Sequence, residues 1–178
     1  MKCLLLNAHS LINKFNIFEA VVNALDADII GVTRSVTTSW AIPQMLDSKI
    51  SLCGYQLVHS DRSSPNKGGG VLLYVRNSLK PTEFSVDIYC NDNVWCQIDD
   101  LLIGVCYRST NYATVGNDNN NKLYKLFNKV STKHVLLMRD FNFSVIDWFS
   151  SGWQKYEIPR YQLNWSPKCS ISIWSLYL

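Results

Sequence analysis

In the first third of the chain, apolar runs, a polar stretch and a helically spaced segment follow one another in an order typical of α/β folds. The run Lys2 to Leu6 is apolar enough for a buried strand, and the polar residues 7–10 can end that strand and start a helix. From Leu11 to Leu25, apolar residues recur at three- and four-residue steps, which predicts an amphipathic helix lying on a sheet. The apolar run 28–33 predicts a second strand. This order of strand, helix and strand indicates an α/β fold.

Beyond residue 54, the pattern changes to short strands separated by turns. The glycine-rich residues 67–70 predict the start of a hairpin, and Asp99 with Asp100 predicts a tight turn. Residues Lys122 to Val130 have the spacing of a second helix. Mixed strands flanked by helices suggest a layered α/β sandwich. The predicted strands are Tyr55 to His59, Val71 to Arg76, Phe84 to Tyr89, Val94 to Ile98, Leu101 to Tyr107 and His134 to Met138.

The last thirty residues lack this organisation. Residues 149–178 contain three tryptophans and three tyrosines, with no sustained period of two or 3.6. We therefore expect one α/β domain over residues 1–148, followed by a tail, 149–178, to which the pattern gives no position in a sheet.

Charge, cysteine content and hydropathy set limits on partners and compartment. Seventeen basic against 14 acidic residues give a net charge of +3, which permits a nucleic-acid partner without requiring one. Six cysteines without a CxxC pair predict reduced, mostly buried thiols of an intracellular protein, with the nucleus among the locations open to it. No apolar stretch approaches the roughly 18 residues that cross a bilayer, so we expect no membrane partner. The sequence gives no indication of the oligomeric state.

Five motifs occur in a specific order. They are LLNAHSL at 5–11, DIIGVT at 28–33, DRSSPNKGGGVLLYVR at 61–76, LIGVCYR at 102–108, and DFNF with DW at 140–148. Together they resemble the endonuclease domain of non-LTR (LINE-like) retrotransposons, a branch of the endonuclease/exonuclease/phosphatase family. That resemblance implies a partial four-layer α/β sandwich of mixed sheets flanked by helices. It also implies Mg²⁺-dependent phosphodiester hydrolysis, with nicking of target DNA as the ancestral activity.

The resemblance assigns roles to particular residues. Asn7 matches an asparagine near the metal, and Tyr107 matches a tyrosine that contacts the scissile phosphate. Asp140 and Asn142 match an Asp-x-Asn pair that orients the attacking water and binds phosphate. Amide and carboxylate oxygens suit a hard cation, and hydroxyl and amide groups can donate hydrogen bonds to phosphate. Arg108 is either a substrate-binding residue or a structural partner.

Structural roles compete with these assignments. Asn7 could be a helix cap, Asp140 with Asn142 could form a turn after a strand, and Tyr107 could be a half-buried aromatic residue. The shared order of the motifs favours a former catalytic site.

The chain also departs from the family pattern. Where the family has a metal-binding glutamate after the second strand, this chain has Arg34, and Arg139 replaces a glycine before the Asp-x-Asn pair. All three histidines precede Asp140, so no residue matches the family's proton-transfer histidine, and we expect the C-terminal part of the domain to be missing. We therefore expect impaired or absent activity and weak Mg²⁺ binding. We further hypothesise that the Arg34 guanidinium contacts Asp140 or the amides of Asn7 and Asn142.

Two other functions remain open at this stage. One is a non-catalytic nucleic-acid or protein-binding module that reuses the phosphate-facing surface, made more basic by Arg34 and Arg139. The other is a retroelement fragment without a selected function.

Overall fold

The computed structural model describes residues 1–8, 11–33, 48–60, 70–88, 92–108, 119–140, 156–157 and 170–175. The helical elements are η1 (Ile12–Lys14), α1 (Phe15–Leu25), η2 (Asn77–Leu79) and α3 (Asn119–Val130). The strands are β1 (Lys2–Asn7), β2 (Ile29–Thr33), β3 (Tyr55–Ser60), β4 (Val71–Arg76), β5 (Thr82–Glu83), β6 (Asn93–Ile98), β7 (Leu101–Tyr107), β8 (His134–Asp140), β9 (Tyr156–Glu157) and β10 (Ser170–Ser175).

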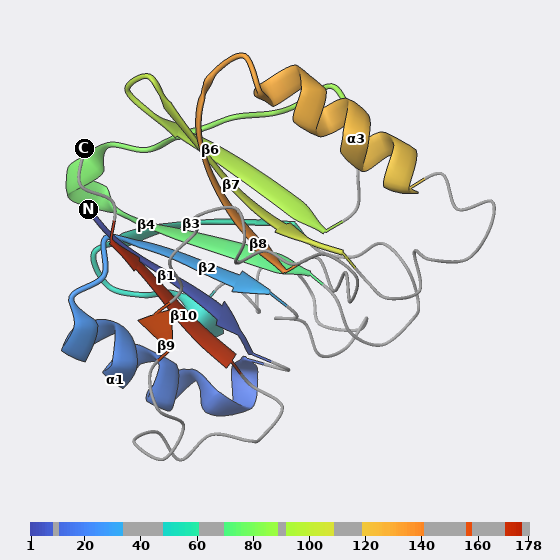
Figure 1. The fold of residues 1–178 in the computed structure, drawn as a ribbon. Helices are drawn as coiled ribbons and strands as arrows, with labels where there is room; N and C mark the ends of the chain where they lie inside the picture. Colours follow the sequence, from blue (N-terminus) through green and yellow to red (C-terminus); the bar gives the residue numbers. More distant parts are fainter. Residues whose placement is uncertain are drawn as a thin grey trace.

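Two mixed sheets lie face to face between two helices. The larger sheet has the order β3-β4-β2-β1-β10-β9, and the smaller one has the order β5-β6-β7-β8. Helix α1 covers the outer face of the larger sheet, and α3 covers the outer face of the smaller sheet (Figure 1). The α/β sandwich of mixed sheets predicted from the sequence is confirmed.

Three apolar cores hold these four layers together. Leu4 and Leu6 of β1 pack towards α1, whereas Cys3 and Leu5 pack between the two sheets. Both faces of β1 are therefore buried, which explains why its sequence is apolar throughout instead of alternating. The third core joins the smaller sheet to α3, where Leu126 is fully buried.

The predicted elements are mostly confirmed, with one strand wrong. The first helix begins as the short turn η1 and continues as α1, and the second extends over Asn119–Val130. The strand predicted over Phe84 to Tyr89 does not form: β5 is Thr82–Glu83, and residues 84–88 leave the sheet. Phe84, Val86 and Ile88 nevertheless pack against the third core. Every second side chain of this segment is therefore partly buried although the segment is not a strand. The prediction was wrong because the same alternation is typical of a strand.

Part of the tail has a place in the larger sheet. Ser170–Ser175 forms β10, which pairs antiparallel with β1 from Lys2↔Ser175 to Asn7↔Ser170. The sequence pattern predicts no position for this segment. Its first four residues, Ser-Ile-Ser-Ile, do alternate between polar and apolar, but four residues are too few to stand out in an aromatic-rich tail.

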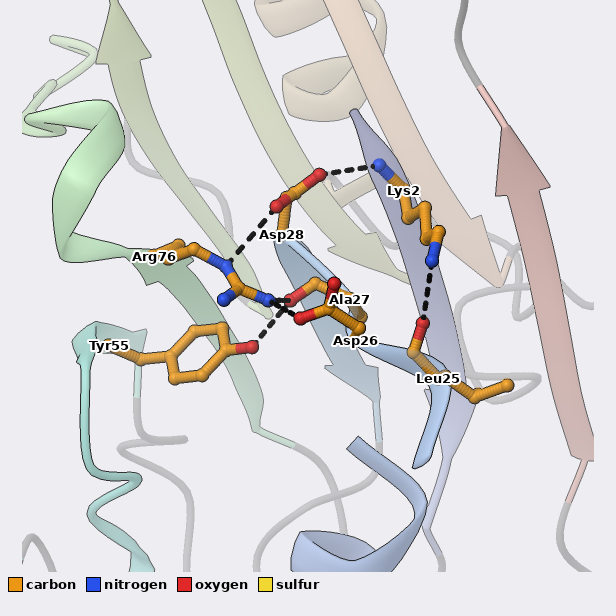
Figure 2. Close-up of polar contacts among 7 residues, drawn as sticks. All are labelled: Lys2, Leu25, Asp26, Ala27, Asp28, Tyr55 and Arg76. Atoms are coloured by element: carbon orange, nitrogen blue, oxygen red, sulfur yellow. Dashed lines mark hydrogen bonds and ion pairs between the residues drawn. The ribbon is translucent and has the colours of Figure 1, made fainter. Parts of the chain in front are cut away.

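A polar network fixes the turn between α1 and β2 (Figure 2). Arg76, at the end of β4, donates hydrogen bonds to Asp26 (2.6 Å) and to the carbonyl of Ala27 (3.0 Å). Its Nε lies 3.2 Å from Asp28, close enough for an ion pair although the N–H is not aligned for a hydrogen bond. The backbone N–H of Lys2 donates to the other oxygen of Asp28 (2.8 Å). These contacts fix the amino-terminal ends of β1 and β2, so the carboxyl ends lie at the opposite edge.

The described cysteines carry free thiols, as predicted. Cys3, Cys96 and Cys106 are buried, and Cys53 is exposed. Burial raises the pKa of the Cys3 thiol to about 11 and that of Cys96 to about 12, so both remain protonated at neutral pH. Within the described ranges, no helix has the length and hydropathy needed to span a membrane.

Candidate site at the carboxyl ends of the strands

β1, β2, β7 and β8 are among the described strands that end at one edge of the sandwich. β1 and β2 are parallel and end at the paired residues Asn7 and Thr33, while β7 and β8 are parallel and end at Tyr107 and Asp140. The arrowheads of these strands point to the same side in Figure 1. The Asn7 amide Nδ2 donates a hydrogen bond of 2.8 Å to Asp140 Oδ2 and so joins the two sheets.

Strand pleating directs these four side chains towards the space between the sheets. Cys3 and Leu5 pack in the inter-sheet core, so Asn7, two residues further along β1, faces the same way. The same alternation applies to β8, where Leu136 and Met138 precede Asp140. Thr33 follows Ile29 and Gly31 on β2, and Tyr107 follows Ile103 and Val105 on β7. We call these four residues the edge cluster: Asn7, Thr33, Tyr107 and Asp140.

The edge cluster is largely buried and offers oxygen atoms to a ligand. Thr33 is fully buried, Tyr107 is 9% exposed, and Asn7 and Asp140 are half-buried. Asn7 Oδ1 and Thr33 Oγ1 are buried without a hydrogen-bond partner in the described structure. Together with the Asp140 carboxylate, these oxygens are of the type that Mg²⁺ prefers. Among the described residues, however, no three His, Cys, Asp or Glu side chains gather in a group that could hold a metal ion.

A buried aspartate positions the end of β7. Asp92 is 2% exposed, and its carbonyl accepts a hydrogen bond of 2.9 Å from the backbone of Tyr107. Its carboxylate accepts another, also of 2.9 Å, from the backbone of Gly70. Gly70 has a φ of +74°, a conformation that costs little only for glycine. Asp92 thus ties the start of β4 to the end of β7 and supports Tyr107.

Two described arginines near this edge, Arg108 and Arg139, are directed towards α3. Arg108 is 4% exposed, and its Nε donates a hydrogen bond of 3.0 Å to Asn120 Oδ1 in the first turn of α3. Arg139 lies on β8 with Leu137 on the face that packs against α3, and burial lowers its pKa. This corrects the interpretation that Arg139 makes the phosphate-facing surface more basic, since adjacent residues of a strand point to opposite faces and Asp140 faces the other sheet. Substrate binding by Arg108 stays a prediction.

Two of the sequence-predicted positions, Asn142 and Arg34, lie outside the described residues, so the proposed contact of Arg34 with Asp140 also stays a prediction. The structure instead adds Thr33, which the sequence analysis did not select. The feature that could have pointed to Thr33 is its position at the end of the predicted strand 28–33, two residues after Gly31, which faces the other sheet.

No protein-family model matches the chain, and no curated protein matches it in sequence. Solved structures do match its fold. An endonuclease/exonuclease/phosphatase family protein from Leptotrichia buccalis is similar at a TM-score of 0.59 and 17% identity, over 85% of this chain and 71% of that one. The fold is therefore that of endonuclease/exonuclease/phosphatase proteins.

Two further matches concern DNA and retrotransposons. A 3′ phosphatase, NExo from Neisseria, bound to product DNA hairpin, gives a TM-score of 0.58 at 15% identity, over 83% of this chain and 60% of that one. The endonuclease domain of TRAS1, a telomere-specific non-LTR retrotransposon, gives 0.51 at 12% identity, over 77% and 57%. The chain thus spans less than two thirds of the length of these two structures.

Proposed function

We propose that this chain is a DNA-binding domain derived from a non-LTR retrotransposon endonuclease, with impaired phosphodiester hydrolysis. The observation that carries the proposal is the Asn7–Asp140 hydrogen bond of 2.8 Å, which brings together two motif residues 133 positions apart. The order of the five sequence motifs and the fold shared with the TRAS1 endonuclease domain support the origin.

In this proposal the edge cluster binds a DNA phosphate. The Tyr107 hydroxyl donates a hydrogen bond to a phosphate oxygen, and Asn7 holds the Asp140 carboxylate in position. Asn7 Oδ1, Thr33 Oγ1 and Asp140 are the described oxygens that would hold Mg²⁺, which when bound supplies charge neutralisation and Lewis-acid assistance.

Hydrolysis is impaired in this proposal because one charged position of the family's metal site carries the opposite sign. Arg34 directly follows Thr33 in sequence and replaces the glutamate of the family pattern, a change of two charge units. Mg²⁺ sites in nucleic-acid enzymes commonly use one or two carboxylates, and Asp140 is the one carboxylate in the edge cluster. A guanidinium in place of the family's glutamate attracts phosphate and opposes a cation, so the substitution favours DNA binding over metal-dependent cleavage.

A plasmid-nicking assay with Mg²⁺ or Mn²⁺, run together with a DNA-binding assay, tests this proposal. We expect the wild-type chain to bind DNA in a salt-dependent manner and to nick plasmid no faster than the Asp140→Ala variant. Arg34→Glu should increase the stabilisation of the fold by Mg²⁺ in a thermal melt, since it adds a carboxylate. Nicking that Asp140→Ala abolishes would overturn the impairment, and absence of DNA binding would overturn the function itself.

A further inference from the structure

The two outer helices differ in charge. Helix α3 has the sequence NNNKLYKLFNKV, with three lysines and no acidic residue. Helix α1 has the sequence FNIFEAVVNAL, with one glutamate and no basic residue. Helix α3 is therefore cationic, and it lies over the smaller sheet (Figure 1).

The three lysines of α3 share one flank of the helix. Leu123, Leu126 and Val130 are buried against the smaller sheet, which fixes the rotation of the helix. Residues spaced three and seven apart fall within an arc of about 60°, and seven residues extend about 10 Å along the axis. The lysine flank consists of Lys122, Lys125 and Lys129. Lys125 and Lys129 are exposed, and Lys122 is half-buried.

This flank begins beside the candidate site. Because β7 and β8 are parallel, α3 leaves from the edge where β7 ends and returns to the opposite one. The first turn of α3 is tied to that edge by the hydrogen bond from Arg108 to Asn120. Arg108 is buried and ties the helix to this edge, and the lysines that follow along the flank are Lys122 and then Lys125.

We propose that the lysine flank binds the phosphate backbone of a DNA strand that extends from the edge cluster. This inference rests on the proposed function, because it takes the edge cluster as the start of the strand. Phosphates follow each other at about 3.4 Å of axial rise per strand, so a flank of about 10 Å matches roughly three of them. Lys129 pairs with Asp87 at 2.8 Å, so this ion pair opens when Lys129 binds a phosphate.

Salt-dependent DNA binding of a Lys122→Gln/Lys125→Gln double variant tests the proposal. The matched control is Lys49→Gln/Lys80→Gln, which removes the same two charges from exposed positions outside α3. Measured by fluorescence anisotropy, the slope of log K against log salt should fall by about two for the α3 variant, as expected for two lost phosphate contacts, and by much less for the control. Lys125→Gln alone, at an exposed position, should lower it by about one and provides the test if the double variant does not fold.

The outcomes distinguish failure of the lysine flank from failure of the proposed function. Wild-type binding with an unchanged slope in the α3 variant overturns the lysine flank and leaves the proposed function standing. Equal losses in both double variants also overturn it, because net charge alone would explain them. Absence of wild-type binding overturns both. Unlabelled polyglutamate and unlabelled DNA of the same total charge are then compared as competitors for the labelled DNA. Equally strong competition by polyglutamate would indicate an acidic protein partner and overturn DNA as the partner of the lysine flank.

Discussion

A side-chain hydrogen bond joins the two sheets at the edge of an apolar interface. The inter-sheet core is formed by residues such as Leu5, Val105 and Met138, and it ends at the hydrogen bond between Asn7 and Asp140. A hydrogen bond to a charged group contributes about 1.5–3 kcal/mol. The carboxylate is therefore held at the edge where we propose that a phosphate binds, and its charge opposes that phosphate unless a cation lies between them.

Asp140→Asn should strengthen DNA binding in EDTA. The replacement amide can still accept the hydrogen bond from Asn7, but it removes the repulsion of phosphate. One unit charge at about 6 Å in water amounts to about 0.7 kcal/mol, or roughly threefold in affinity. The control is Asp100→Asn, which removes a charge from an exposed turn at the opposite edge. Unchanged or weaker binding by the Asp140 variant, measured by anisotropy, would contradict a phosphate site beside this carboxylate.

The sequence pointed to part of the edge cluster but not to the residues that support it. The resemblance to the endonuclease family gave Asn7 and Tyr107, and the apolar pattern placed both at the ends of predicted strands. Thr33 and Asp92 were missed because their importance depends on contacts that form only in the fold: the first on its register with Asn7, the second on its bond to Gly70.

At the scale of the element, β7 depends on a glycine inside the strand. A Cβ placed on Gly104 would lie 2.2 Å from the Trp95 ring of the neighbouring strand. That ring is held by a hydrogen bond from its Nε1 to Asn93 (2.8 Å) and is 3% exposed. Gly104 is therefore required for the close packing of an aromatic ring over the backbone.

Gly104→Ala should destabilise the fold by about 1–3 kcal/mol, the usual cost of overpacking a core. Gly31→Ala is the matched comparison, since its nearest contacts are the side-chain ends of Val105 and Leu5, at 3.0 and 3.2 Å, which can move slightly. We expect a clearly smaller loss there. Urea denaturation of both variants measures the difference, and equal midpoints would show that the Trp95 ring adapts to a methyl group.

Elements with an apolar pattern over many residues were predictable from the sequence. Elements that form only through pairing with another strand were not. Both helices showed apolar spacing over at least two turns, and β7 is a seven-residue apolar strand, so local sequence was sufficient for each. The segment after β5 alternates like a strand but packs against α3 without a partner strand. Strand β10 has almost no signal of its own and is defined by its pairing with β1.

At the scale of the whole molecule, β10 determines whether β1 is an interior strand. β1 pairs with β2 on one side and with β10 on the other. The pairing with β10 extends over six residue pairs. Leu4, Leu5 and Leu6 give β1 two apolar faces. Without β10, this strand would present unpaired backbone groups between those faces, an arrangement that promotes edge-to-edge association.

A chain ending at residue 169 should therefore lose much of its stability and self-associate. Each net backbone hydrogen bond contributes about 1 kcal/mol, so losing a six-residue pairing is comparable to the stability of a small domain, about 5–15 kcal/mol. A chain ending at residue 175 is the control, because it retains all of β10. Thermal melts and size-exclusion chromatography distinguish the two, since we expect a lower melting temperature and larger species only for the shorter chain. If both chains are monomers with the same melting temperature, β10 does not complete the sheet. The edge cluster, which includes Asn7 at the end of β1, then does not depend on β10.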